Sequence, residues 1–444
     1  MAIHTIRTTC LLALGLGLGC TSDDAGSDEV EGTGTDGAEA GTDETQGTGD
    51  TGDESSGTDT GDDPNAACAS TWDVVEKKAN GQVHAAYDVA IAADGNFVAV
   101  GKLENADDDA WIGMFGPAGE PIWDEVVDSG SGKDYAASVT FDASGDVVVV
   151  GSLANTNKDL WIEKRSAAAG AIAWTVIEPS EFDGDNLPGA IGLAPDGGLI
   201  VAATIRAGDQ DSDLALRKLS TADGAQVWTT SFSGAADPNG YSIDQARALA
   251  VAADGSIYVG IEQGVDAGTK EGALLKYGPD GGAEQWRLAP KDDGSEHLQE
   301  VVAVAAGPEG EAYFVVYEPE VWSLYRASSA GSVEWELTQD DFMFSPTSAW
   351  QISDLAISAA GTLTIGGRLI DEEVGQSISW SEAWLADIRL DGVGECISSH
   401  TWKNTHIIPA STYAYAFAEG PDGVIAVGEV VDGPENYLWF GGFE

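Results

Sequence analysis

The side chains that most often perform chemistry in proteins occur in this sequence without the spacings that catalysis needs. The histidines form no HExxH motif and no closely spaced pair that would bind zinc. No GxSxG nucleophile turn is present. Carboxylates are abundant, with 75 Asp and Glu among 444 residues, so a catalytic pair among them has no recognisable pattern. The sequence therefore predicts no particular reaction.

A run of alternating aspartates is the candidate metal site. Asp209, Asp211 and Asp213 form a DxDxD run, which is half of a calcium loop. The next position holds Leu214 where an EF-hand needs Gly, and Ser220 stands where it needs a bidentate Glu. We therefore expect no EF-hand and no resident cofactor, and weak Ca²⁺ binding at the three aspartates stays open.

Aromatic residues in two insertions are the candidate binding residues. The insertions read TQDDFMFSPTSAW and LIDEEVGQSISWSE in an otherwise repetitive chain. Their side chains form either a contact patch for a glycan or protein partner or caps over the small cores of the insertions themselves. The candidates are Phe342, Phe344, Trp350 and Trp380.

The net charge limits the classes of partner. The chain has 20 Lys and Arg against 75 Asp and Glu, a formal charge of −55. Such a charge repels phosphate backbones and anionic head groups, which excludes nucleic-acid binding and basic membrane docking. A hydrophobic content of 43% still permits a substantial core.

A repeat must position these residues. Seven times the chain alternates apolar and polar residues, turns at a glycine, and enters a second apolar strand, as in SVTFDASGDVVVVG. Alternation with a period of two, broken by Asp-Gly or Ser-Gly, predicts a β-hairpin. The turn glycines are 50 to 62 residues apart, which indicates a repeat fold. They are Gly95, Gly145, Gly197, Gly255, Gly310, Gly361 and Gly423.

A second hairpin follows in most units, marked by Gly and, four residues later, Trp. These tryptophans are Trp123, Trp174, Trp228, Trp286 and Trp335. In the sixth unit Gly394 precedes Trp402 by eight residues, which predicts an enlarged turn. Each unit thus supplies four short antiparallel strands, the composition of a β-propeller blade.

The two ends of the chain complete each other. The seventh unit stops after its third strand, NYLWFGGFE, whereas a surplus strand, STWDVVEKK with Trp72, precedes the first hairpin. A ring whose N-terminal strand completes the last blade leaves no free sheet edge. We therefore predict an all-β fold, a seven-bladed β-propeller with four antiparallel strands per blade, closed by its N-terminal strand.

Residues 1–20 predict export. Arg7 is followed by the apolar stretch Leu11 to Leu18 and by Cys20, as in a signal peptide. The ending LGLGC resembles bacterial lipoprotein signals, which implies that Cys20 is lipidated.

Residues 21–67 are rich in Gly, Thr, Ser, Asp and Glu and contain no Lys, Arg or aromatic residue, which is typical of a disordered tether. Residues 68–444 form the predicted propeller, held at the outer membrane or cell surface of a bacterium.

The repeats resemble known families. Units such as DYAASVTFDASGDVVVVGSL look like the SBBP and delta-60 repeats of bacterial surface β-propellers. The GxxxW spacing is similar to the tryptophan-docking motif of quinoprotein-like propellers. That resemblance implies the fold and little chemistry, because a quinone-dependent enzyme would be expected to have a vicinal cysteine pair and this chain has no adjacent cysteines.

Two cysteines remain after removal of the signal and lipidation of Cys20. Cys68 and Cys396 both stand at the start of fourth strands in neighbouring blades, and the exported chain meets an oxidising compartment. We predict a disulfide between them. Two separate thiols are the alternative, because fourth strands lie at the rim, where neighbouring blades diverge.

Together these features predict a lipid-anchored, monomeric β-propeller that acts as a non-enzymatic binding, adhesion or scaffold module for a protein or polysaccharide. The alternative is a hydrolase or lyase acting on a polysaccharide through carboxylates at the central mouth.

Overall fold

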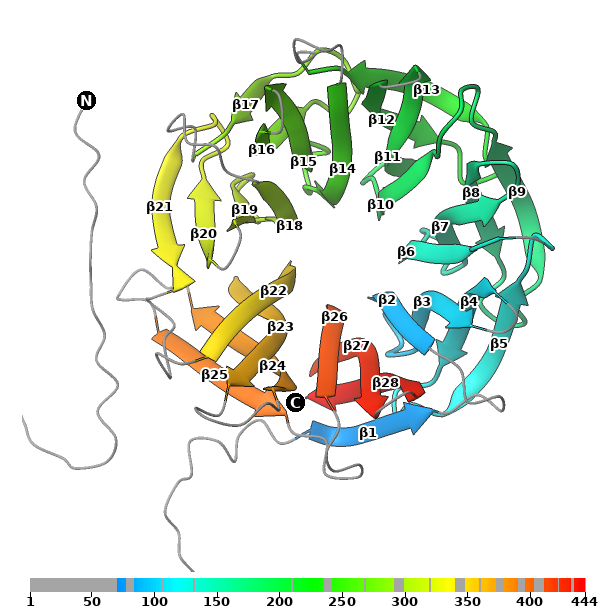
Figure 1. Ribbon diagram of the computed structural model, residues 1–444, viewed down its shortest axis with the longest axis vertical. Helices are drawn as coiled ribbons and strands as arrows, with labels where there is room; N and C mark the ends of the chain where they lie inside the picture. Colours follow the sequence, from blue (N-terminus) through cyan, green and yellow to red (C-terminus); the bar gives the residue numbers. More distant parts are fainter. Residues whose placement is uncertain are drawn as a thin grey trace, which may run out of the picture.

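The structure, a computed structural model, consists of β-strands around a central axis (Figure 1). It contains no helix with the length and hydrophobicity needed to cross a bilayer, among the residues that it describes. These residues are 70–76, 84–104, 107–130, 132–208, 211–234, 242–266, 269–290, 299–318, 321–339, 348–358, 361–372, 379–389, 396–402, 411–421, 423–432 and 435–443.

Within these ranges the strands form seven four-stranded antiparallel blades, and a short parallel pairing of β12 with β14 joins two of them into one sheet. From the inside outward, the first three blades are β2 (His84–Ile91), β3 (Phe97–Glu104), β4 (Asp108–Phe115) and β5 (Pro121–Val127); β6 (Tyr135–Phe141), β7 (Val147–Ala154), β8 (Lys158–Arg165) and β9 (Ile172–Glu178); and β10 (Leu187–Leu193), β11 (Leu199–Gly208), β12 (Asp211–Leu219) and β13 (Gln226–Phe232).

The remaining four blades follow in the same order. They are β14 (Ser242–Val251), β15 (Ile257–Asp266), β16 (Thr269–Tyr277) and β17 (Trp286–Leu288); β18 (Glu300–Ala306), β19 (Ala312–Glu318), β20 (Val321–Ala327) and β21 (Val333–Thr338); β22 (Ser348–Ile357), β23 (Thr362–Glu372), β24 (Ser379–Arg389) and β25 (Cys396–Trp402); and β26 (Ser411–Gly420), β27 (Gly423–Asp432), β28 (Glu435–Phe443) and β1 (Ser70–Glu76).

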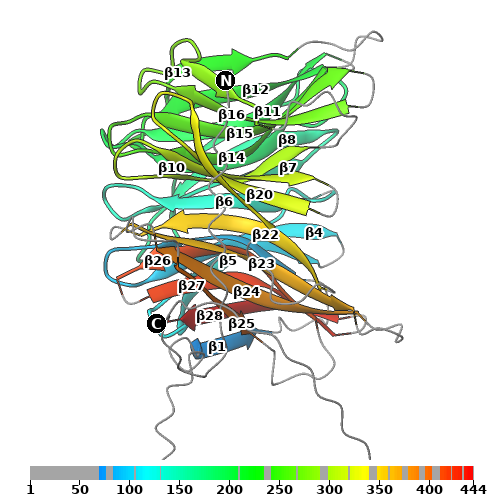
Figure 2. The same ribbon diagram turned by 90° about the vertical axis from the view of Figure 1, so that its left-hand side faces the viewer.

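The predicted ring closure is confirmed. β1 pairs antiparallel with β28, so the first strand of the chain is the outermost strand of the last blade. Both views of the ring show β1 beside β28 (Figures 1 and 2). Because β1 supplies the fourth strand that the seventh unit lacks, β28 has partners on both sides.

Large aromatic side chains on the third strands fill the spaces between blades. Five of the third strands carry a tryptophan that is fully buried. The cluster around Trp111 combines residues of the first and seventh blades. Phe440 from β28 lies 6.1 Å from Trp111 and 4.8 Å from Phe115, measured between ring centroids. Burying such rings is the main stabilising contribution of each blade contact. The buried third-strand tryptophans are Trp111, Trp161, Trp322, Trp384 and Trp439.

The fourth-strand tryptophans dock onto the next blade, as the GxxxW spacing suggested. The indole Nε1 of Trp123 donates a hydrogen bond of 2.6 Å to the carbonyl of Ala167 in the second blade. Gly170, in the turn of that blade, lies against the indole ring, and a Cβ added to it would be 3.1 Å from the nearest ring atoms of Trp123. Its φ of 66° also favours glycine. The turn glycine of one blade therefore leaves space for the tryptophan ring of the preceding blade to pack against it.

The sixth blade departs from this pattern in a different way from the one expected. In the first blade, Trp123 pairs with Met114, which lies three residues after Trp111. In the sixth blade, the residue three positions after Trp384 is Asp387, and it pairs with Ser398. Trp402 lies four residues farther along β25, which begins two residues after Gly394. The surplus residues between glycine and tryptophan therefore extend into the strand instead of enlarging the turn.

Carboxylates on the inner strands connect neighbouring blades. Asp88 accepts hydrogen bonds of 2.8 Å from the backbone N–H of Val89 in its own strand and of Val139 in the next blade. Asp354 accepts in the same way from Leu355, at 2.7 Å, and from Phe417 in the seventh blade, at 2.9 Å. Burial raises the pKa of Asp88 to about 6 and that of Asp354 to about 7, although the amide hydrogen bonds oppose the shift.

These two carboxyl groups predict a loss of stability as pH rises. Their folded-state pKa values lie above the unfolded value of 3.8, so folding favours the protonated form. Their contribution is full below about pH 4 and is lost as pH rises to about 7. We expect the melting temperature to fall between pH 5 and pH 8, and to fall less in the Asp88→Asn and Asp354→Asn variants. Thermal unfolding at constant ionic strength tests this, and equal slopes for wild type and variants would contradict it.

Candidate functional site

Every inner strand carries one extra residue at the same place. The pairing between the first and second strands of each blade shifts by one residue, which is a β-bulge, eight residues before the turn glycine. Bulges change the direction of a side chain and often lie next to binding sites. The bulged residues around the ring are Tyr87, Ala137, Gly189, Arg247, Val302, Ser353 and Tyr415.

A close backbone approach accompanies the bulges. In the seventh blade, a Cβ placed on Gly428 would overlap the carbonyl oxygen of Tyr413. In the first blade, a Cβ on Gly101 would overlap the carbonyl oxygen of Ala85. Glycine on the second strand therefore permits the bulge that positions a tyrosine on the first.

Four tyrosines form a continuous row on the inner strands of blades seven, one and two, and we call Tyr413, Tyr415, Tyr87 and Tyr135 the tyrosine arc. The ring centroids of Tyr413 and Tyr415 are 6.3 Å apart, with nearly parallel planes. Tyr415 and Tyr87 are 6.0 Å apart at 62°, and Tyr87 and Tyr135 are 6.4 Å apart at 85°. All four are half-buried. Their strands β26, β2 and β6 are neighbours around the ring centre (Figure 1).

A cation of the chain itself lies over each end of the tyrosine arc. The guanidinium carbon of Arg368 is 5.0 Å from the ring centroid of Tyr413. The Nζ of Lys158 is 5.5 Å from the ring centroid of Tyr135. These are cation–π distances. The terminal rings of the arc thus already bind positive groups.

Three tyrosines of the arc stay neutral near physiological pH. Burial, with the charge of Asp185 adding to it, raises the pKa of Tyr135 to about 12. Burial and then the charge of Glu429 raise the pKa values of Tyr87 and Tyr415 still further. The hydroxyl of Tyr415 donates a hydrogen bond to Glu429. A neutral tyrosine ring carries a negative face that attracts positive groups.

The opposite side of the ring centre is ionic. Arg247, the bulged residue of the fourth blade, forms ion pairs with Glu262 and with Glu300 of the fifth blade, the latter at 3.0 Å. Lys270 also pairs with Glu262. Burial alone would raise the pKa of Glu262, but hydrogen bonds from Lys270 and Arg247 outweigh it and hold the pKa below its ordinary value. Burial raises the pKa of Glu300.

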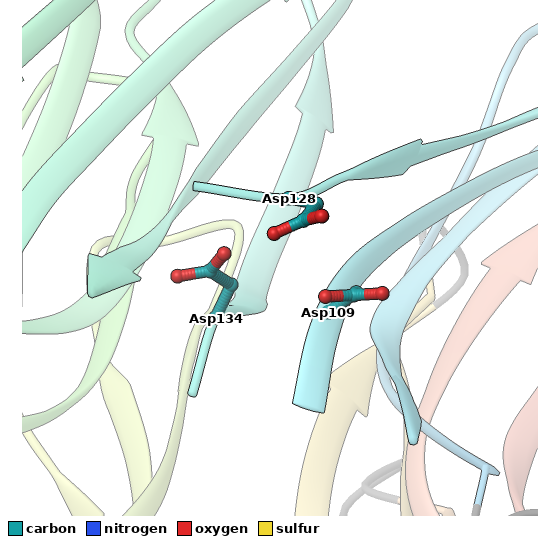
Figure 3. A group of neighbouring side chains, drawn as sticks. All are labelled: Asp109, Asp128 and Asp134. Carbon is teal, nitrogen blue, oxygen red and sulfur yellow. The ribbon is translucent and has the colours of Figure 1, made fainter. Parts of the chain in front are cut away.

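An acidic trio that the sequence did not predict lies between the first two blades. Oxygen atoms of Asp109, Asp128 and Asp134 lie within 4.8 Å of one another (Figure 3). Asp134 accepts hydrogen bonds from the backbone N–H of Ser129, at 2.6 Å, and of Ala154, at 2.5 Å. Because its oxygens are engaged in this way, the trio serves first to hold the loop between β5 and β6.

The predicted aspartate run is partly described. Asp209 lies outside the described residues, whereas Asp211 and Asp213 are half-buried at the start of β12. Each of the two has one oxygen without a hydrogen-bond partner in the part of the chain that the structure describes. Burial, with the charge of Asp211 adding to it, raises the pKa of Asp213. A cation would relieve this repulsion, so Ca²⁺ binding here stays a prediction.

Two of the four predicted aromatic residues lie in strands. Phe342 and Phe344 lie outside the described residues. Trp350 and Trp380, in the two insertions, are in strands, because both insertions lengthen the blade: Trp350 pairs with Leu369 in β23, and Trp380 pairs with Asp371. Whether they contact a partner stays a prediction.

The cysteine predictions fall mainly outside the described part of the chain. Cys20 and Cys68 are not among the described residues, and Cys396 is the first residue of β25. The strands concerned, β1 and β25, are the outermost strands of the seventh and sixth blades. The disulfide between Cys68 and Cys396 therefore stays a prediction.

Comparison with known proteins finds similarity only at the level of solved structures. No family model and no curated protein matches the sequence, so the likeness to SBBP and delta-60 repeats stays a resemblance. Virginiamycin B lyase from Staphylococcus aureus is 12% identical, with a TM-score of 0.49, covering 83% of this chain and 98% of that one.

Two further solved structures are similar over much of the chain. BamB from Moraxella catarrhalis is 11% identical, with a TM-score of 0.35, covering 67% of this chain and 96% of that one. Quinohemoprotein alcohol dehydrogenase from Comamonas testosteroni is 10% identical, with a TM-score of 0.47, covering 85% of this chain and 77% of that one. Identities this low carry no information about ligand or activity.

Proposed function

We propose that this protein is a lipid-anchored propeller at the bacterial outer membrane or cell surface that binds a protein or polysaccharide at the tyrosine arc without transforming it. The arc is the observation that carries the proposal. Four half-buried aromatic rings from three blades form one row, with centroid separations of 6.0 to 6.4 Å, beside the centre of the ring. Aromatic side chains bury much surface on contact at a low cost in side-chain entropy.

The bonding of carboxylates around the ring supports binding over catalysis. Glu262 is paired with Arg247 and Lys270, and Glu429 accepts a hydrogen bond from Tyr415. Asp88 and Asp354 hold backbone amides of the neighbouring blades. A polysaccharide hydrolase or lyase, the alternative function, needs a carboxylate that faces the substrate and exchanges protons with it.

The position of β1 supports a tethered binding module. β1 is the outermost strand of its blade, so Ser70, the first residue that the structure describes, lies at the rim of the propeller (Figure 1). An acidic tether over residues 21–67 and lipidation of Cys20, both predicted from sequence, would then hold the ring at the membrane by its edge.

A binding screen tests the proposal. The propeller, residues 66–444, is screened against a glycan array, purified envelope polysaccharides and purified outer-membrane proteins. For a ligand found in this way, we expect the Tyr87→Ala and Tyr415→Ala double variant to bind at least about tenfold more weakly, because two ring contacts are lost.

The matched control removes apolar side chains at the rim. Ile172 and Val227 are 56% and 60% exposed on outer strands, so the Ile172→Ala and Val227→Ala double variant should bind as wild type does. Equal binding by wild type and the tyrosine variant would place the ligand elsewhere. New reducing ends or unsaturated products in a polysaccharide digest would instead support the enzyme alternative.

A further inference from the structure

Resting on the function proposed above, we propose that the middle of the tyrosine arc, Tyr415 and Tyr87, binds an organic ammonium cation carried by the ligand, such as a quaternary or alkylated amine. The ligand group is thus defined by charge and shape, and the macromolecule that carries it remains to be found by the screen.

The geometry of the middle rings fits a compact cation. Tyr87 meets Tyr135 at 85° and Tyr415 at 62°, with centroids 6.4 and 6.0 Å apart. Rings at steep angles form adjoining walls, and their negative faces attract a positive group placed against them. Recognition of alkylated ammonium groups by several aromatic rings uses this arrangement.

The chain's own cations show which faces are already used. Arg368 lies over Tyr413 and Lys158 lies over Tyr135 at the two ends of the arc. Within the described ranges, no lysine or arginine is placed over Tyr415 or Tyr87 in this way. The two middle rings therefore have the same chemistry as the occupied ends, and no described lysine or arginine is placed over them, although the charge of Arg368 reaches Tyr415.

The surrounding charge favours a cation over an anion. Glu429 accepts a hydrogen bond from Tyr415, and its negative charge contributes to the raised pKa of Tyr87. Asp108 contributes in the same direction, although Lys102 and Lys133 pair with it at 3.1 and 3.4 Å. At longer range the net charge of −55 concentrates cations at the surface.

A pair of isosteric probes isolates the charge. Choline and its neutral carbon analogue, 3,3-dimethylbutan-1-ol, are titrated separately into the chain without its signal, residues 21–444. Binding is followed by ¹⁹F NMR of incorporated 3-fluorotyrosine. The chain has 11 tyrosines, and spectra of Tyr87→Phe and Tyr415→Phe assign the two relevant signals.

We expect choline to shift the signals of Tyr87 and Tyr415 and to bind at least about tenfold more tightly than the neutral analogue. Tyr87→Ala and Glu429→Gln should weaken choline binding, and Tyr87→Phe should retain it, because a phenyl ring keeps the negative face. Added NaCl should weaken binding, since the attraction is electrostatic. The rim variant Val227→Ala should bind choline as wild type does.

Three results would overturn the inference. They are equal affinity for choline and its neutral analogue, binding of choline that Tyr87→Ala leaves unchanged, and absence of any choline-dependent shift. If neutral oligosaccharides shift the arc signals instead, the cation site is wrong while the arc stays the binding site of the proposed function. Failure of the proposed function itself would appear separately, as polysaccharide cleavage or as ligand binding that ignores the arc.

Discussion

Deleting residues 70–78 is expected to lower the melting temperature by about 10 °C or more, or to cause aggregation. This deletion removes β1, whose backbone pairs with β28 from Ser70↔Phe443 to Glu76↔Leu438. Without it, β28 becomes the open outer edge of the seventh blade, at the rim of the ring. An unpaired edge of this kind is a template for intermolecular pairing. Differential scanning calorimetry and size-exclusion chromatography measure both effects.

The control deletion removes residues 21–60 from the predicted tether and leaves β1 in place. Its melting temperature should equal that of the full mature chain, because no described strand is affected. If both deletions are tolerated equally, β1 contributes little to closure, and the pairing with β28 is peripheral to stability.

The Gly428→Ala substitution is expected to destabilise the fold by about 3 kcal/mol or more, the range of strained substitutions in a core. The added Cβ would overlap the carbonyl oxygen of Tyr413, and this atom belongs to the backbone, so no side chain can rotate away. The inner strand must move, and Tyr415 moves with it. Chemical denaturation measures the free energy of unfolding, and ligand binding reports the displaced ring.

Gly264 is the matched control. It also lies on a second strand, β15, but a Cβ there would meet its nearest atom, the backbone N of Ile243, at 3.5 Å, an ordinary contact. Gly264→Ala should change the free energy of unfolding by less than about 1 kcal/mol. Similar losses in Gly428→Ala and Gly264→Ala would show that the close approach at the bulge is unimportant.

The architecture could be predicted from sequence because it depends on local patterns. A turn glycine such as Gly145 fixes a hairpin between residues that are adjacent in the chain. The missing fourth strand of the last unit and the surplus strand containing Trp72 identified a long-range pairing by simple complementarity. Trp402 lies in the predicted fourth strand, but the turn before it was expected to be enlarged, because glycine-to-tryptophan spacing does not reveal where the extra residues lie.

The tyrosine arc could not be predicted from alternation alone. In the sequence HAAYDVAI, a period of two places Tyr87 on the same face as Val89, which is buried. The bulge shifts the register between Ala86 and Asp88, so the two residues do not share an environment. The sequence did contain one indication of the bulged position. The residue eight positions before the turn glycine is a tyrosine in two blades, Tyr87 and Tyr415, and Arg247 in a third. Comparing that column across the repeats would have drawn attention to it.

The closure by β1 also orders the folding of the chain. β1 is synthesised before all other strands of the propeller, and its partner β28 is the last. During synthesis β1 therefore has no partner while blades one to six form from short-range hairpins. Contacts between residues so distant in sequence form slowly, because a large loop must close first. We therefore expect ring closure to be the final event of folding, and until it occurs β1 lacks its partner and the outer edge of β28 is open, the stage at which the chain depends most on protection from aggregation.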